Sequence, residues 1–286
     1  MEKDTYHSKL LTWGIWITGL AAAGFMVADV LMRPTLGWVQ LMPVYCLAAF
    51  ALMHSFTFMG TRRAIWFAAL GMILPFVAEY LGTNFGAIFG SQWLHRAQDL
   101  RISIDVMLPG SVPLTAVLTW YGMLYVTFVS SVYLLKAKTS DISAFATVPL
   151  TAGLLMALWQ LPTGPASISR HMMSFGQNGF YHGIPLSSFI GWFVTALFVV
   201  LFFQIMEPTA VNADRFREPE QRLAPLTFAM YAAMVGYSSL ICLRQNMPGA
   251  GWLGMIVVLL FCLTLLVRSR ATNPAVELNR QPSAVV

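Results

Sequence analysis

The sequence is poor in charged residues for its length. Only 10% of its 286 residues are Asp, Glu, Lys or Arg, whereas 57% are hydrophobic. A soluble globular domain needs far more polar surface than this to cover its core, so that class of protein is excluded. The Lys and Arg residues form no basic run, so the net charge of +5 does not indicate a nucleic-acid-binding protein.

Cysteines are few, and the common catalytic motifs are absent. Cys46, Cys242 and Cys262 each lie in an apolar stretch, and we interpret them as small buried side chains instead of disulfide or metal ligands. The five histidines are too scattered for a metal cluster. The sequence has no P-loop, CxxC, HExxH or GxSxG motif, and we expect neither a cofactor nor a metal.

Long apolar runs, in contrast, are abundant. Stretches of about 18 residues or more, enough to cross a hydrocarbon core of roughly 30 Å, occur about eight times. This pattern predicts an all-α fold, a polytopic bundle of about eight transmembrane helices. We expect one domain over residues 1–268 and a polar cytoplasmic tail over 269–286. The expected spans are Leu10–Met32, Leu41–Gly60, Ala64–Gly82, Leu114–Leu135, Ser143–Leu161, Leu186–Met206, Pro225–Leu243 and Gly251–Val267.

The distribution of positive charge predicts the orientation of this bundle. Connections rich in Lys and Arg tend to face the cytoplasm. Of the 17 Lys and Arg residues, the first, third, fifth and seventh connections hold only Arg33, Arg96, Arg101, Arg170 and Arg244. We therefore expect both termini in the cytoplasm, and we expect a multi-pass protein of the bacterial cytoplasmic membrane.

Two connections on the opposite, extracytoplasmic side have unusual sequences. The third, Thr83–Pro113, and the fifth, Pro162–Pro185, are long and rich in glycine, proline, aromatic and aliphatic residues. Long loops in compact structures are usually functional or disordered, and these two are too apolar to extend into water. We expect them to pack against the bundle and to form a lid over one cavity.

Two acidic residues lie within the expected spans. A charge at the centre of a membrane helix costs on the order of 2.5–3.5 kcal/mol, so such residues often mark functional sites. Glu79 lies near the outer end of the third span, and Asp29 lies at a similar depth in the first. Both are candidate catalytic residues. The structural alternative is that each reaches the interface or pairs with an arginine such as Arg96 or Arg101.

His182 is a third candidate catalytic residue, in the stretch Asn178–Phe193 before the sixth span. A neutral imidazole there could relay a proton or orient a carboxylate. The alternative is an interfacial histidine with one satisfied nitrogen. Aromatic residues of the same stretch either form an interfacial belt or line a pocket in which their faces stabilise a cation.

Three stretches resemble the family of carotenoid biosynthesis membrane proteins. Glu79–Gly90 contains EYLG and FGAIFG, Pro109–Tyr125 begins with PGSVPL, and Gly179–Phe193 contains GFYHGIPL and FIGWF. The resemblance spans about Ala64–Phe193 and implies a carotenoid hydratase-like enzyme, a lyase that adds water across the terminal double bond of an acyclic carotenoid. The glutamate of the family corresponds to Glu79. The aromatic residues implied in substrate binding are Phe85, Phe89, Trp120, Tyr125, Tyr181, Phe189 and Trp192.

The chain departs from the family pattern at two places. The family has an Asp-Leu-x-x-Asp-Pro element where this sequence has Gln160–Pro165, so both aspartates are missing, at Gln160 and Gly164. The aromatic pair that usually follows the Phe-Gly of the third connection is replaced by Gln92 and Leu94. These departures indicate a divergent member of the family.

The chemistry implied by the resemblance is acid-catalysed hydration. Protonation of a trisubstituted alkene gives a tertiary carbocation, which water then captures, so the site needs a neutral carboxylic acid, an aromatic wall and controlled water. Glu79 would supply the acid, Tyr181 and Trp192 the wall, and His182 or Asp29 would orient water.

Two other functions remain open. With water excluded, the same groups perform terpene cyclisation. A non-catalytic carotenoid- or lipid-binding protein is the third possibility, and the missing aspartates favour it. The expected partners are an isoprenoid or carotenoid substrate from the bilayer and membrane lipid, with other pathway enzymes as further candidates and no nucleic acid.

The expected orientation is directly testable. A reporter that is active only in the cytoplasm should be active when fused after Arg280 or within Val211–Arg222, and silent near Arg101 or Ser167, because of the positive charge on the first two segments. Reporter activity is measured in whole cells at matched expression levels. The opposite pattern would place the two unusual connections in the cytoplasm.

Overall fold

The computed structural model describes residues 2–32, 37–94, 105–135, 142–176, 179–208 and 223–271. Within these residues, eight helices are long and apolar enough to cross a membrane, which confirms the predicted all-α polytopic bundle. Most of the predicted polar tail, together with Arg96 and Arg101, lies outside the described residues. The helices are α1 (Glu2–Met32), α2 (Trp38–Met59), α3 (Thr61–Phe85), α4 (Leu114–Leu135), α5 (Ile142–Ser169), α6 (Leu186–Met206), α7 (Ala224–Arg244) and α8 (Pro248–Ala271).

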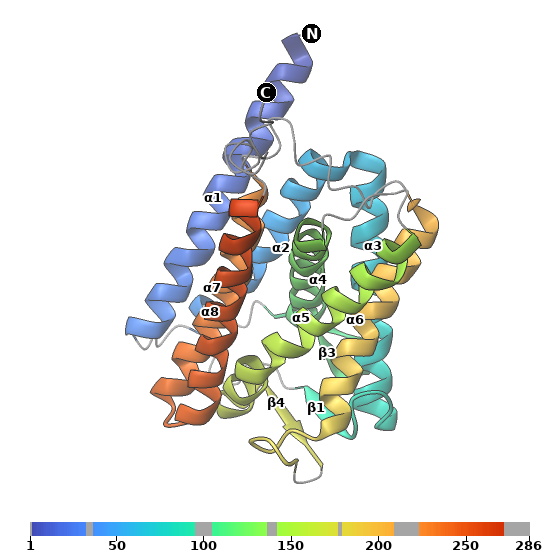
Figure 1. Ribbon diagram of the computed structural model, residues 1–286. Coiled ribbons are helices and arrows are strands. Elements are labelled where there is room, and N and C mark those ends of the chain that lie inside the picture. Colours follow the sequence, from blue (N-terminus) through green and yellow to red (C-terminus); the bar gives the residue numbers. More distant parts are fainter. Residues whose placement is uncertain are drawn as a thin grey trace, which may run out of the picture.

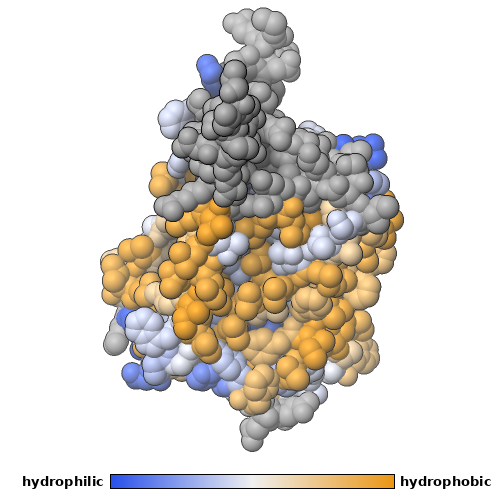
Figure 2. Space-filling model, in the orientation of Figure 1, coloured by the Kyte–Doolittle hydropathy of each residue, from blue (hydrophilic) through white to orange (hydrophobic). Residues whose placement is uncertain are grey.

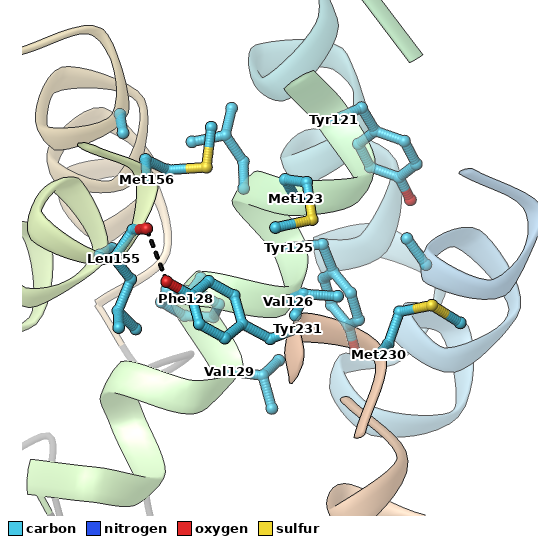
Figure 3. Close-up of a cluster of buried hydrophobic side chains, with 14 of the residues drawn as sticks. Tyr121, Met123, Tyr125, Val126, Phe128, Val129, Leu155, Met156, Met230 and Tyr231 are labelled. Atoms are coloured by element: carbon cyan, nitrogen blue, oxygen red, sulfur yellow. Dashed lines mark hydrogen bonds between the residues drawn. The ribbon is translucent and has the colours of Figure 1, made fainter. Parts of the chain in front are cut away.

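Helix α4 forms the centre of the bundle, between α1, α7 and α8 on one side and α3 and α6 on the other (Figure 1). In an apolar window of 18 residues taken from each helix, 78% of the residues of α4 are buried, compared with only 22% of those of α1. The core around α4 is aromatic: Phe67 packs edge-on against Tyr125 and Phe203, with ring centroids 5.7 and 4.9 Å apart. The Tyr231 hydroxyl donates a hydrogen bond of 2.8 Å to the Leu155 carbonyl, which ties α7 to α5 (Figure 3).

The outer surface is apolar where lipid would surround it. Figure 2 shows a broad hydrophobic band across the middle of the visible face, with hydrophilic residues toward the end opposite the N-terminus. In a membrane, an apolar side chain is in an apolar environment whether it contacts lipid acyl chains or other side chains. Apolar residues can therefore cover the surface that faces lipid. Large exposed apolar residues on α1 and α8 include Leu20, Leu31, Trp252, Leu259, Leu263 and Val267.

The two unusual connections meet at one end of the bundle. Helix α1 begins and α8 ends at the opposite end (Figure 1). Strand β1 (Gln92–Leu94) of the third connection pairs antiparallel with β4 (Met173–Phe175) of the fifth. In the third connection, β2 (Met107–Leu108) pairs with β3 (Val112–Pro113) around the 3-10 turn η1 (Pro109–Ser111). Both connections therefore pack on the bundle as one unit.

Helix α5 is longer than the sequence indicated. The span expected from the sequence ends at Leu161, but Pro162 and Pro165 both lie inside the helix, which ends at Ser169. A proline has no N–H and leaves the carbonyl four residues earlier without its helical partner. The carbonyl of Leu161, which Pro165 frees in this way, accepts a 3.0 Å hydrogen bond from the Tyr181 hydroxyl. This replacement bond allows the helix to continue inside an apolar environment.

Pairing of the two connections predicts a specific cross-link. Trp93 lies opposite Ser174 in the β1–β4 register, and Cα atoms of such pairs are about 4.5–5.5 Å apart, within the range for a disulfide. In a background without Cys46, Cys242 and Cys262, W93C with S174C should oxidise to an intramolecular disulfide, detected by mass spectrometry of linked peptides.

A matched control shifts the second cysteine by one residue. W93C with F175C places the two side chains on opposite faces of the ribbon, because the side-chain period of a strand is two residues. This pair should remain reduced under the same conditions. Equal oxidation of both pairs, or none of either, would contradict the register.

Candidate functional site

The carboxyl group of Glu79 points into the bundle from α3, where Glu79 is buried. The indole Nε1–H of Trp120 on α4 donates to Glu79 Oε1 at 2.7 Å. The amide Nε2 of Gln92 in β1 donates to Oε2 at 2.6 Å. Trp120 and Gln92 are buried as well. Two helices and the third connection therefore fix this carboxyl group, and no arginine takes part in the contacts that the structure shows.

Glycines allow the third connection to return to Glu79. Gly86 ends α3 with a left-handed backbone (φ 67°), a conformation that residues with a side chain rarely adopt. The chain then places Phe89 against α6, where a Cβ on Gly191 would lie 2.5 Å from the Phe89 ring and 2.8 Å from the Ile88 carbonyl oxygen. On α3, a Cβ on Gly82 would lie 2.9 Å from Phe89. This close packing positions the following strand, and with it Gln92, over the carboxyl group.

A cavity of about 110 Å³ adjoins Glu79, and three tryptophan side chains are among those that line it. Trp120, Trp159 and Trp192 come from α4, α5 and α6. The ring centroid of Trp192 lies 4.9 Å from that of Trp120 and 5.3 Å from that of Trp159. The cavity therefore combines the buried carboxyl group of Glu79 with aromatic faces, which attract positive charge.

The same cavity has a polar edge beneath the paired connections. Asp105 lines it and accepts hydrogen bonds from the backbone N–H of Thr115 at 3.2 Å and from the Thr115 hydroxyl at 2.8 Å. Thr119 lines it one turn further along α4. Leu94 of the third connection and Met173 of the fifth also line the cavity, so the two connections cover it jointly, as the sequence predicted.

One known protein family matches most of the chain. The carotenoid biosynthesis protein family matches residues 39–261. The chain belongs to this family. The matched range contains Glu79 and every residue that lines its cavity, whereas α1 lies outside it. Comparisons with curated proteins and with solved structures gave no match.

Some of the predicted site residues lie together in this carotenoid biosynthesis protein. Glu79, Trp120 and Trp192 share the cavity, and Phe89 packs behind Trp120 with ring centroids 6.1 Å apart. Trp159 was not predicted, although it directly precedes the divergent stretch at Gln160. Gln92 attracted notice only as a departure from the family pattern.

Other predicted residues lie outside the cavity lining. His182 is exposed at a turn with φ 47°, and Tyr181 beside it bonds to α5. Burial raises the pKa of Tyr181 to about 12, so its hydroxyl keeps its proton and remains a donor to Leu161. Phe189 packs on Tyr181 at 5.7 Å between ring centroids. Phe85 is 70% exposed, and Tyr125 is buried in the core with its hydroxyl 2.5 Å from Nδ1 of His54.

Asp29 belongs to a different polar cluster. Its Oδ2 accepts a hydrogen bond of 2.5 Å from Arg170 Nη2 and another of 2.5 Å from the Tyr237 hydroxyl. The cavity beside Asp29 is separate from the cavity of Glu79. The structure therefore does not bring the three predicted catalytic residues, Glu79, His182 and Asp29, into one site. Among the described residues, no His, Cys, Asp and Glu side chains gather in a group that could hold a metal ion.

The two positions without the family aspartates are occupied differently. Gln160 donates from Nε2 to the Ser188 hydroxyl at 2.7 Å, which joins α5 to α6. Gly164 lines the cavity of Glu79, but a Cβ there would collide with Cδ1 of the buried Ile184. Ile184 thus fills the space that a side chain at position 164 would enter, and the cavity loses an acid at this point.

Close packing of the third connection on α6 predicts the effect of one methyl group. G191A should destabilise the protein by about 1–3 kcal/mol, because the added Cβ meets the Ile88 backbone and the Phe89 ring. Thermal unfolding in detergent, followed by tryptophan fluorescence, measures the change.

G236A is the matched control on α7. A Cβ on Gly236 has no atom within 4 Å, so this substitution should leave the unfolding temperature nearly unchanged. If G191A unfolded at the same temperature as G236A, the third connection would not pack on α6 as described.

Proposed function

We propose that this carotenoid biosynthesis protein is a membrane enzyme that adds water to the terminal double bond of an isoprenoid chain, with Glu79 as the proton donor. The observation that carries the proposal is the buried carboxyl group of Glu79 beside a cavity walled by three tryptophans. Membership of the family supports a role in the carotenoid pathway.

The hydrogen bonds to Glu79 suit a carboxyl group that gives up a proton. Trp120 and Gln92 each use one lone pair on one oxygen, and each oxygen keeps another lone pair that can carry a proton. Once the proton moves to the alkene, the same two N–H groups stabilise the carboxylate that remains. Such donors, already in place before the reaction, need no rearrangement when the charge develops.

Carbocation formation and capture then require different walls of the cavity. Proton transfer to the less substituted alkene carbon leaves a tertiary cation, and the faces of Trp120, Trp159 and Trp192 would stabilise it. Water approaching from the edge formed by Asp105 and Thr119 would add to the cation and return one proton to the Glu79 carboxylate. The cycle thus consumes one alkene and one water and restores the neutral acid.

The size of the cavity fits reaction at the end of a long chain. About 110 Å³ is well below the roughly 300–1,000 Å³ of pockets that enclose drug-sized ligands. The cavity would therefore admit only the terminal part of a prenyl chain, with the remainder lying outside it. This is the geometry that a terminal double bond requires.

The missing aspartates favour a second candidate. With Gln160 and Gly164 in those positions, the protein would retain the cavity but lack part of the family's polar groups, as in a non-catalytic carotenoid-binding protein. Cyclisation of the isoprenoid chain is the third candidate. Product mass separates them: hydration adds one water, cyclisation leaves the mass unchanged, and a binding protein gives no product.

Removal of the transferable proton tests the role of Glu79. E79Q should lower turnover of an acyclic carotenoid by roughly 10²–10⁴, the usual contribution of a general acid. Folding should be retained, because Gln92 can turn its amide so that its oxygen accepts from the new amide group. Product formation is measured by liquid chromatography and mass spectrometry on protein shown to be monodisperse.

E207Q is the control for loss of a buried carboxylate elsewhere. Glu207 pairs with Arg62 at 2.8 Å and with Arg63 at 3.4 Å, near the end of the bundle where α3 begins. Turnover per folded molecule should stay near that of the parent protein. An E79Q protein as active as the parent would exclude Glu79 as the acid, and a parent protein that binds but never converts carotenoid would favour the non-catalytic candidate.

A further inference from the structure

An apolar groove runs between α1 and α7, which lie side by side (Figure 1). A hollow of about 400 Å³ is lined by Met26, Val27, Leu31, Ala233, Gly236 and Leu240. A second hollow of about 160 Å³ shares Met26 and Ala233 with the first and continues toward Ile15. The two hollows therefore form one groove along both helices.

The length of this groove suits the hydrocarbon part of a lipid. From Ile15 to Val30, α1 rises by about 22 Å at 1.5 Å per residue. One leaflet of the hydrocarbon core is about 15 Å thick. The groove could therefore hold an extended chain through a whole leaflet, and the space at Gly236, where a Cβ would meet no atom within 4 Å, lies in its wall.

A polar pocket lies at the end of the groove where α1 and α7 finish. It measures about 520 Å³, and Val30 lines both it and the groove. Its polar lining includes Asp29, Gln40, Arg170, His171, Arg244 and Asn246. Two guanidinium groups thus face a single carboxylate, which leaves a net positive charge in the pocket.

The two arginines are held in different ways. Arg170 is fixed by Asp29 and by the hydroxyl of Tyr237, 3.1 Å from its Nη1, and Tyr237 also lines the groove. Arg244 donates from Nη1 to the carbonyls of Asp29 and Val30, but no carboxylate pairs with it in the described part of the chain. Arg244 therefore offers a fixed cation with N–H groups left for an anion.

We propose that the groove and the polar pocket together bind one membrane lipid with an anionic phosphate headgroup. The guanidinium fork of arginine matches phosphate oxygens, whereas a zwitterionic headgroup would bring a second cation toward Arg170 and Arg244. A cation in the last turn of α7 also stabilises that helix end, but this role alone needs neither the second arginine nor the adjoining groove. The lipid site is separate from the cavity of Glu79 and does not depend on the proposed reaction.

Native mass spectrometry of delipidated protein tests the lipid site. Phosphatidylglycerol should remain bound at concentrations where phosphatidylcholine is lost. R244Q should weaken phosphatidylglycerol binding by roughly ten-fold or more, as expected for loss of a charge-assisted hydrogen bond. G236F places a ring in the groove, at a position that does not line the polar pocket, and should weaken binding of phosphatidylglycerol as well.

Control measurements separate this site from general attraction of anions. R62Q removes a positive charge from the N-terminal end of α3, where the Arg62 side chain is 79% exposed, and should leave lipid binding unchanged. Inorganic phosphate should neither displace phosphatidylglycerol nor raise the unfolding temperature. Equal retention of both lipids, equal losses in R244Q and R62Q, or displacement by inorganic phosphate would overturn the proposal. If R244Q does not fold, unchanged binding in G236F overturns it alone.

Discussion

The two N–H groups that hold the Glu79 carboxyl group are the interaction on which the rest of the site depends. A carboxyl group inside a membrane bundle is costly unless its oxygens have partners. Trp120 supplies one partner from the central helix, and Gln92 supplies the other from a strand outside the spans. Because Gln92 must reach the buried carboxyl group of Glu79, the third connection has to pack on the bundle, and its pairing with the fifth connection then covers the cavity.

Position in the membrane explains several features that would be unusual in a soluble protein. Apolar side chains cover the outside, and the polar groups lie inside or at the ends, where they bond with one another. Pro165 of α5 is tolerated because the Tyr181 hydroxyl bonds to the Leu161 carbonyl and replaces the missing helical bond. Polar clusters such as that of Asp29, Arg170 and Tyr237 then join helices distant in sequence.

The sequence predicted the membrane spans and drew attention to Glu79, but it did not predict all of the residues that line the cavity. Length and hydropathy identify membrane helices well, and an acid inside such a helix is conspicuous because of its cost. Trp159 gave no such signal, since α5 is apolar all round and the sequence does not show which face turns inward. Gln92 lies in an irregular connection whose path depends on close contacts at Gly82 and Gly191, and these contacts follow only from the folded structure.

The hydrogen bond from Tyr181 to Leu161 also has a consequence for how fast the cavity exchanges its contents. If the fifth connection moved away from α5, the Leu161 carbonyl would lose its partner where water is scarce, at a cost of about 1–3 kcal/mol. That cost lowers the population of the separated state by roughly 5- to 150-fold. Since β4 is paired with β1, the third connection would have to move with it, and entry through this end of the bundle would be slow compared with motions of a free loop.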